Sequence, residues 1–334
     1  MFSDYIFPMD CYIVILILLL LTMGLKGFYP LLKKTCAYVP DVVGLTDLEG
    51  KTVAMDGDYF LYKAMHGTTS GTTFTAKDLA TCVIRWLRAA RNAGITTIFV
   101  TSGGAPPVEK IQQCLAGRKR KRGRQEEKIQ VLEEKIRAST CPIGDELVMR
   151  DQICRMKDAV RCIDPIMAVD VVRQVRDAGF ECVESVSEAD FMLVLLSEQG
   201  RCDYVATDDA DILVSGAHRT LRGLVPLLSS GTSARVFTRA DILSALGLTS
   251  AQLLELGCLL SCDYQAPISK VGPVTALRMI QAHGTIKAFL ESDAFTSTKK
   301  KKPRYELPGM MTSDDYVRQT TRSIAIFQSR PDIL

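Results

Sequence analysis

Two tight clusters of carboxylates are the side chains of this sequence whose types and spacing could do chemistry. They lie within residues 187–211 and comprise Glu188, Asp190, Asp208, Asp209 and Asp211. Carboxylates two residues apart on a strand point to the same side, so Asp209 and Asp211 would converge if the preceding strand continues that far. Oxygen ligands gathered in this way suit a hard divalent cation such as Mg²⁺ or Mn²⁺. A helix cap followed by an acidic loop is the alternative that these residues leave open.

The elements that would position these acids follow from the spacing of apolar residues. Strands are predicted at residues 51–55, 96–100, 180–185, 204–207, 219–226 and 234–238. Helices are predicted at residues 25–32, 76–92, 165–178, 241–246, 250–261 and 274–283. This order predicts an α/β fold with a central, mostly parallel sheet flanked by helices on both faces.

In such sheets, ligands gather beyond the carboxyl ends of the strands. Asp56 directly follows the first predicted strand, and Asp209 closely follows the strand at 204–207. Glu188 and Asp190 fall at a helix start, where unpaired N–H groups and the helix dipole favour acidic side chains. We therefore expect Asp56 and Asp209 to share one site.

The composition bounds the class of protein. A chain of 334 residues, 47% hydrophobic and 24% charged, describes one large or two ordinary globular domains. The formal charge of +3 says little about partners, so local clusters must carry that argument. Three histidines and eleven cysteines without a CxxC pair argue against a zinc site and favour buried thiols in a reducing compartment.

The amino end carries an unbroken apolar run, CYIVILILLLL, at residues 11–21. A membrane span needs about 20 such residues, so the run is short for one. Asp4 and Asp10 precede it, which does not fit the basic start of a signal peptide. We favour a third interpretation, in which translation begins at Met23, and we expect no membrane association.

Two basic clusters indicate a polyanionic partner. Residues 118–124 read RKRKRGR, within a charged and helix-prone region at 108–160. A solvated surface or a nuclear-import signal is the alternative, and binding and import can coexist. The tail from residue 292 contains further lysines and no strong periodic pattern, so we expect it to be flexible.

Six short motifs in register resemble the flap-endonuclease/XPG family of structure-specific nucleases. They run from residue 23 to about residue 283 and are MGLKGFYPLL, KTVAMDGDYFLYKA, SEAD, ATDDADIL, LLSCDY and VGPVTAL. The resemblance implies a PIN-like nuclease fold with a helical arch and a helix–two-turn–helix DNA-binding element. It also implies hydrolysis of DNA at junctions between single and double strands, with 5′ flaps favoured, in replication or repair.

The resemblance also implies the metal ligands. They are Asp56, Glu188, Asp190, Asp209, Asp211 and Asp263, and they would hold two Mg²⁺ ions, with Mn²⁺ as an alternative. Two metals about 4 Å apart would stabilise the attacking and departing oxygens of a phosphodiester. Asp190 stands where the family commonly has Glu.

One departure from the family pattern concerns charge. The family has an Asp in a segment like FDGxPP, whereas this chain reads FVTSGGAPP and places Gly103 in the acidic position. Ser102 beside it could hold a water but contributes no charge. We therefore also consider a weakened or purely DNA-binding protein, and a relative that cleaves RNA.

Further positions are carried over from the family to the arch and the substrate path. Lys110 matches a basic residue at the base of the arch, and its partner is Arg118 or Arg120. The rest of the basic run, Lys119, Lys121 and Arg122, would follow the substrate backbone. Tyr62 matches an aromatic that stacks on a base, although an ordinary core tyrosine is equally compatible.

The two ends of the resembling region complete the comparison. Gly24 matches the family's processed amino end, which lies close to the active site. Gly272 lies in the turn of the helix–two-turn–helix, where Lys270 replaces the first Gly of the usual GxGP. The tail has no sliding-clamp peptide with paired aromatics, and we expect a monomer. The compact length favours the relatives that large DNA viruses encode.

The expected organisation has five parts. They are an apolar extension (1–22), an N-terminal nuclease region with the arch (23–130), a helical connection (131–164), an internal nuclease region with the helix–two-turn–helix (165–291) and a basic tail (292–334). We expect a location in the nucleus, or the host nucleus for a viral protein, and leave a cytoplasmic location open.

Overall fold

The computed structural model describes residues 25, 27–35, 38–67, 74–112, 116–138, 143–296, 298–299, 302–303, 305–309 and 311–331. The chain forms two compact units, each assembled from separate stretches of sequence. The sheet unit comprises Pro40–Thr207, Gly216–Thr238 and Ser329–Leu334. The helical unit comprises Met1–Val39, Asp208–Ser215 and Arg239–Gln328. The apolar run at 11–21 and Gly24 lie outside the described residues.

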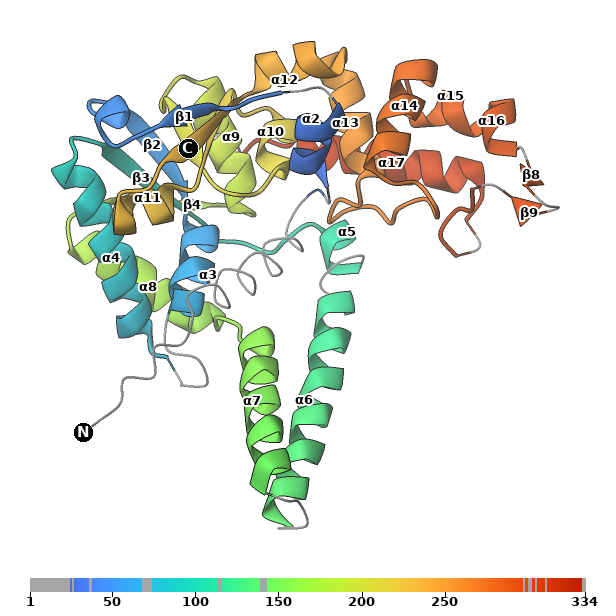
Figure 1. The fold of residues 1–334 in the computed structure, drawn as a ribbon. Helices are drawn as coiled ribbons and strands as arrows, with labels where there is room; N and C mark the ends of the chain where they lie inside the picture. Colours follow the sequence, from blue (N-terminus) through green and yellow to red (C-terminus); the bar gives the residue numbers. More distant parts are fainter. Residues whose placement is uncertain are drawn as a thin grey trace. The chain divides into compact units, whose positions relative to one another are not determined.

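The sheet unit is built on a seven-stranded sheet in the order β1-β7-β6-β5-β2-β3-β4 (Figure 1). Its strands are β1 (Asp41–Val43), β2 (Thr52–Asp56), β3 (Thr96–Ser102), β4 (Glu181–Ser185), β5 (Tyr204–Ala206), β6 (Arg219–Arg222) and β7 (Ala234–Thr238). The five strands from β6 to β4 are parallel, β7 is antiparallel to β6, and β1 is antiparallel to β7. The prediction of a mostly parallel α/β sheet is confirmed.

Helices cover both faces of this sheet. Residues 53–56 of β2 and 97–101 of β3 are buried at every position, which is typical of parallel strands enclosed on two sides. α3 (Gly57–Gly67), α4 (Ala76–Asn92) and α8 (Pro165–Asp177) pack together, whereas α9 (Ala189–Glu198) packs against β2 to β5. The start of α4 is fixed by a capping box, in which Thr75 and Asp78 bond each other's backbone N–H groups.

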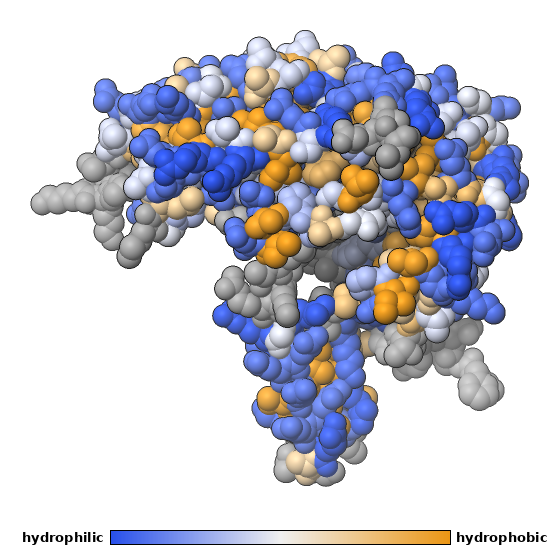
Figure 2. All heavy atoms as spheres, turned by 180° about the vertical axis from the view of Figure 1, so that it is seen from behind, coloured by the Kyte–Doolittle hydropathy of each residue, from blue (hydrophilic) through white to orange (hydrophobic). Residues whose placement is uncertain are grey.

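A long antiparallel helix pair projects from the sheet unit. It consists of α6 (Ala116–Arg137) and α7 (Ile143–Val160), preceded by the short α5 (Val108–Lys110) (Figure 1). Figure 2 shows mainly hydrophilic side chains on this pair, with a few apolar ones among them. Val131 and Leu147 are exposed apolar side chains of the two helices. The expected boundary at residue 130 falls inside α6, because no Gly or Pro interrupts residues 124–137.

The helical unit contains no strand of the large sheet. Its helices are α2 (Phe28–Thr35), α10 (Asp211–Ser215), α12 (Arg239–Leu246), α13 (Ser250–Leu259), α14 (Pro273–His283), α15 (Ile286–Leu290), α16 (Asp293–Thr296) and α17 (Ser313–Phe327), with a two-stranded β8–β9 hairpin at Thr298–Lys299 and Lys302–Pro303. Among the described residues, no single helix has the length and apolarity to cross a membrane, although α12 and α13, bent by 80°, pass that test of length and composition as a pair.

The structure differs from the sequence predictions in three elements. The strand expected at 219–226 ends at Arg222, and Leu224–Ser230 forms helix α11 after the left-handed Gly223. The short strand β1 was not predicted. The tail was expected to be flexible, yet α17 packs on α13 and buries Tyr316 and Phe327. The buried residues of α17 are three or four positions apart and so lie on one face, but two of the four, Thr320 and Ser323, are polar, and the pattern was overlooked.

Candidate active site

Asp56 ends β2 and is held firmly at the carboxyl edge of the sheet. Its side chain is only 5% exposed and accepts two hydrogen bonds. One comes from the backbone N–H of Tyr59 at 3.0 Å, in the first turn of α3, and the other from the Thr207 hydroxyl at 2.8 Å, just after β5. Because burying a carboxylate is costly unless it is hydrogen-bonded, these bonds explain how the acid is tolerated there.

Glu188 stands at the same edge, immediately before α9. It is 6% exposed and forms an ion pair with Lys110 of α5. Glu188 occupies the N-cap position of α9, but its side chain makes no hydrogen bond that caps the helix. Asp190 follows in the first turn of α9 and is half-buried. The structure thus brings Lys110 to one of the acids that the sequence analysis predicted.

The end of β3 is bonded to both neighbouring segments. The Ser102 hydroxyl donates to the Asp58 carboxylate at 2.5 Å and accepts the backbone N–H of Ala189 at 2.9 Å. From the sequence we considered Ser102 but overlooked Asp58. The signal for Asp58 was present in MDGD, since it follows Asp56 by two residues.

Gly103 and Gly104 pack directly against the chain at 185–187. A Cβ at Gly103 would lie 2.5 Å from the Ser185 carbonyl oxygen, and one at Gly104 would lie 1.9 Å from the Val186 carbonyl oxygen. The N–H of Gly103 also donates to the Ser187 carbonyl at 3.2 Å. Position 103, where the family pattern has an acid, therefore lies so close to the backbone of Ser185 that no side chain fits there.

The other three predicted acids belong to the helical unit. Asp211 begins α10 and is 4% exposed, and its N–H donates to the Asp209 carboxylate at 2.9 Å. The Tyr29 hydroxyl donates to the Asp209 carbonyl at 3.5 Å. Asp263 lies in the turn after α13 and is half-buried. Asp209 does not continue a strand, because β5 ends at Ala206, so the period-two argument for this pair was wrong and the helix start at Asp211 orients it instead.

The six acids are thus divided equally between the two units. In the part of the chain that the structure describes, no three or more His, Cys, Asp or Glu side chains are gathered as a metal site. The donors are nevertheless all carboxylate oxygens, and three of them, Asp56, Glu188 and Asp211, are almost fully buried. This chemistry fits a hard divalent cation.

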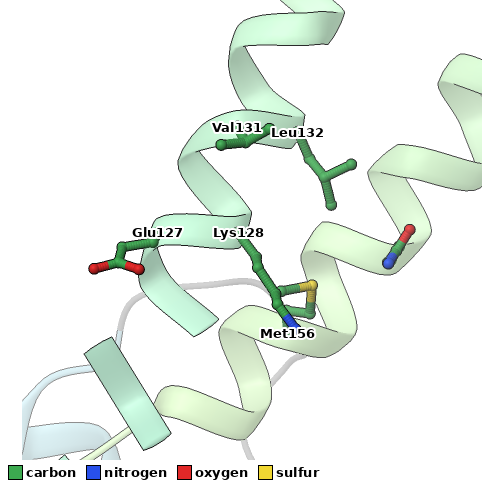
Figure 3. Close-up of a pocket in the computed structure, with 6 residues that line it drawn as sticks. Glu127, Lys128, Val131, Leu132 and Met156 are labelled. Atoms are coloured by element: carbon green, nitrogen blue, oxygen red, sulfur yellow. The ribbon is translucent and has the colours of Figure 1, made fainter. Parts of the chain in front are cut away.

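The basic run lies on the first half of α6, with Arg118, Lys119, Arg120 and Lys121 on consecutive helical positions. Arg122 pairs with Glu126 at 3.6 Å and donates to the Cys162 sulfur at 3.0 Å. A cavity of about 380 Å³ lies farther along the pair and contains none of the predicted site residues. Figure 3 shows Leu132 and Met156 in the space between α6 and α7.

Tyr62 is half-buried on α3. Its ring meets the His66 ring edge-on, with centroids 4.3 Å apart. Burial lowers the pKa of His66, and the nearby Arg161 lowers it further. Arg161 also donates to the Met65 carbonyl at 3.2 Å, so the end of the α7 segment is bonded to α3.

Lys270 adopts a left-handed backbone conformation, with φ at +68°. That region favours glycine, which is the residue the resemblance led us to expect there. Its ammonium lies 3.5 Å from the Glu306 carboxylate, and Ser269 and Glu306 form an isolated β-bridge. Gly272 occupies the N-cap of α14, where no side chain caps the helix, and Pro273 follows at its first position.

The fold and these acids define an α/β protein with nuclease-like organisation, and comparison with known proteins agrees. The XPG N-terminal domain model matches residues 23–127, and the XPG I-region model matches residues 179–263, together more than half of the chain. The chain is 29% identical to flap endonuclease 1-A of Sorghum bicolor over 86% of this chain and 72% of that protein. It is 27% identical to flap endonuclease 1 of Ostreococcus tauri, over 81% and 68%.

Solved structures show the same fold. The catalytic core of Rad2 in complex with a DNA substrate aligns with a TM-score of 0.59 at 20% identity, over 80% of this chain and 71% of that one. Flap endonuclease-1 from Methanococcus jannaschii aligns with a TM-score of 0.57 at 16% identity, over 91% and 99%. The chain belongs to the XPG family of flap endonucleases and related nucleases.

Proposed function

We propose that this protein is a structure-specific endonuclease that cuts DNA at junctions between single and double strands, with 5′ flaps as the favoured substrate. The observation that carries the proposal is the set of buried, hydrogen-bonded carboxylates within a chain of the XPG family. Flap endonucleases are its relatives by name, and a structural neighbour was solved with a DNA substrate. A role in DNA replication or repair, and a location in the nucleus, belong to the same proposal.

The proposed cofactor is a pair of Mg²⁺ ions, with Mn²⁺ as a substitute. Their ligands would be the six acids, Asp56, Glu188, Asp190, Asp209, Asp211 and Asp263. When bound, the ions would neutralise charge on the phosphate and lower the pKa of a water. Water would attack phosphorus as the P–O3′ bond breaks. One proton of the water would be released to solvent and the other would go to the departing O3′, which leaves a 5′-phosphate and a 3′-hydroxyl.

The chain's own cations would act on the substrate. Lys110 is positioned beside Glu188 at the sheet edge, where an ammonium can stabilise negative charge on the scissile phosphate. The basic residues of α6, with Arg118 or Arg120 as the partner of Lys110, would contact the backbone of the single strand. Tyr62 would stack on a base near the cut, and the turn at Lys270 and Gly272 would contact the duplex.

The test is cleavage of a labelled 5′-flap duplex by the full chain and by the chain beginning at Met23, with Mg²⁺ and with Mn²⁺. We expect a single cut near the junction. Asp209→Ala should abolish cutting and leave DNA binding intact, whereas Asp241→Ala, which removes an exposed acid of the same unit, should cut normally. No cleavage by folded protein with either metal would contradict the enzymatic proposal.

A second candidate function is DNA-junction binding without turnover. The packing of Gly103 against Ser185 favours it, because the chain has no space for a carboxylate at that position. This alternative predicts flap affinity that does not depend on a divalent metal and no product. A matched RNA flap in the same assay separates DNA cleavage from RNA cleavage.

A further inference from the structure

The start of α9 presents an unusual capping arrangement. Ser, Thr, Asp and Asn are the residues whose short side chains normally cap a helix, yet the N-cap here is Glu188, which makes no such bond. The first N–H of the helix, that of Ala189, is instead satisfied by the Ser102 hydroxyl at 2.9 Å. The cap thus comes from the end of β3, 87 residues earlier in the chain.

The borrowed cap is itself oriented by a charge. A hydroxyl has one proton, and the Ser102 hydroxyl directs that proton to the Asp58 carboxylate, at 2.5 Å. Its lone pairs are thereby turned toward Ala189. Hydrogen bonds to an ionised acceptor are roughly twice as strong as neutral ones. Asp58 therefore selects the orientation of the hydroxyl in which Ser102 can cap α9.

Further contacts lock the same two segments together. Gly103 donates to the Ser187 carbonyl at 3.2 Å, and the Ser187 hydroxyl donates to the Ala105 carbonyl at 2.9 Å. β3 and β4 are also in register up to the pair Ser102 and Ser185. The position of the α9 start is consequently set by the loop after β3, and not by a cap of its own.

We infer that Asp58 and Ser102 form a positioning pair that holds the start of α9, and with it the carboxylates of Glu188 and Asp190, for the proposed metal-dependent reaction. The inference rests on the proposed function. Because Ser102 caps the helix, the side chain of Glu188 is available for Lys110 and for a cation. The pair acts through Ala189 and not on the substrate. It also contributes a negative charge beside Gly103, where the family pattern has an acid.

The experiment uses the full chain and five variants, one of which combines Ser102→Ala with Asp58→Ala. Ser102→Ala removes the cap, Asp58→Ala removes the charge that orients it, and Ser102→Thr keeps a hydroxyl. Asp78→Ala is the matched control, because Asp78 also accepts a hydroxyl hydrogen bond, from Thr75 at 2.8 Å, at the start of a different helix. Each protein is examined for amide hydrogen exchange at Ala189 without metal, for Mn²⁺ affinity by calorimetry, and for kcat and KM on the flap substrate.

We expect Ser102→Ala and Asp58→Ala to speed exchange at Ala189 and to weaken Mn²⁺ binding about tenfold, with kcat reduced at subsaturating metal and KM for DNA unchanged. The double variant should exchange at Ala189 no faster, and bind Mn²⁺ no more weakly, than Ser102→Ala alone, because both changes break the same chain of hydrogen bonds. Ser102→Thr and Asp78→Ala should match the unaltered protein in all three measurements.

The results that would contradict the positioning role of Ser102 and Asp58 differ from those that would contradict the proposed nuclease activity. Unchanged exchange at Ala189 in Ser102→Ala would overturn the cap, and faster exchange with normal Mn²⁺ affinity would overturn the positioning role. Either result leaves the proposed nuclease intact. Absence of Mn²⁺ binding and cleavage by the unaltered chain would contradict the proposed function, and this inference with it.

Discussion

The carboxyl edge of the sheet and the projecting helix pair α6–α7 belong to the same unit but are stabilised in different ways. At the edge, Asp56 and Glu188 are almost fully buried and each is held by specific partners. On the helix pair, charges are exposed and pair mostly within their own helix, as Arg150 does with Glu146, and a cavity remains between the helices. Catalytic side chains must be held in a fixed geometry, which burial and specific partners provide. An exposed charged surface suits a substrate that binds and dissociates.

The sharpest test of this contrast is the cost of truncating an apolar side chain in each region. Phe99 is fully buried in β3, and Phe99→Ala should lower the free energy of unfolding by about 3–5 kcal/mol. Leu132 is half-buried beside an existing cavity, so Leu132→Ala should cost less than about 2 kcal/mol. Urea unfolding measures both, and equal losses would show that the helix pair is packed as tightly as the sheet.

A second test compares turnover with binding at the edge. Asp56→Asn keeps the size and the acceptor for Tyr59 but removes the charge, so cleavage should fall by more than about 100-fold, the upper range for residues that only support a ligand. Flap affinity should stay within a few-fold of the unaltered protein. A variant that cuts within tenfold of normal, at any Mg²⁺ concentration, would remove Asp56 from the metal site.

The corresponding change on the helix pair should have a smaller and different effect. Arg122→Gln removes one cation of α6, so binding to the flap should weaken while kcat at saturating DNA is preserved. The slope of log affinity against log salt should fall by about 1 if Arg122 contacts one phosphate. Affinity measured between about 50 and 200 mM salt gives that slope. An unchanged slope would show that Arg122 lies off the substrate path.

The smallest expected effect concerns pH at the junction between the two regions. Burial lowers the pKa of His66 from 6.5, with Arg161 adding to the shift, so the folded protein binds this proton more weakly than the unfolded chain does. The unfolded chain takes up the proton near pH 6.5, and stability should therefore fall as pH drops below that value. His66→Gln should reduce the loss between pH 7.5 and roughly 5.5. Thermal unfolding across this range is the measurement. An equal loss of stability in both proteins would show that a group other than His66 causes the pH dependence.

The sheet and most of its strands could be predicted from the sequence because apolar runs of this length encode local structure. Ala234–Thr238 was predicted to the residue, and four other strands within one or two residues at either end. The misses have local causes. The three residues of β1 are too few for a periodic signal, and the left-handed Gly223 turns the chain into α11 where an apolar stretch suggested a longer strand.

Residue types and family motifs were enough to predict six acids, Lys110 and the basic run on α6 as site residues, because such predictions depend only on which residues are present and in what order. Tertiary structure decided the rest. Asp58 becomes significant only when β3 brings the Ser102 hydroxyl to it, and Gly103 only when the chain at Ser185 packs against its Cα. Hydrogen bonds between residues 44 and 87 positions apart have no periodic signature, so spacing along the chain could not reveal them.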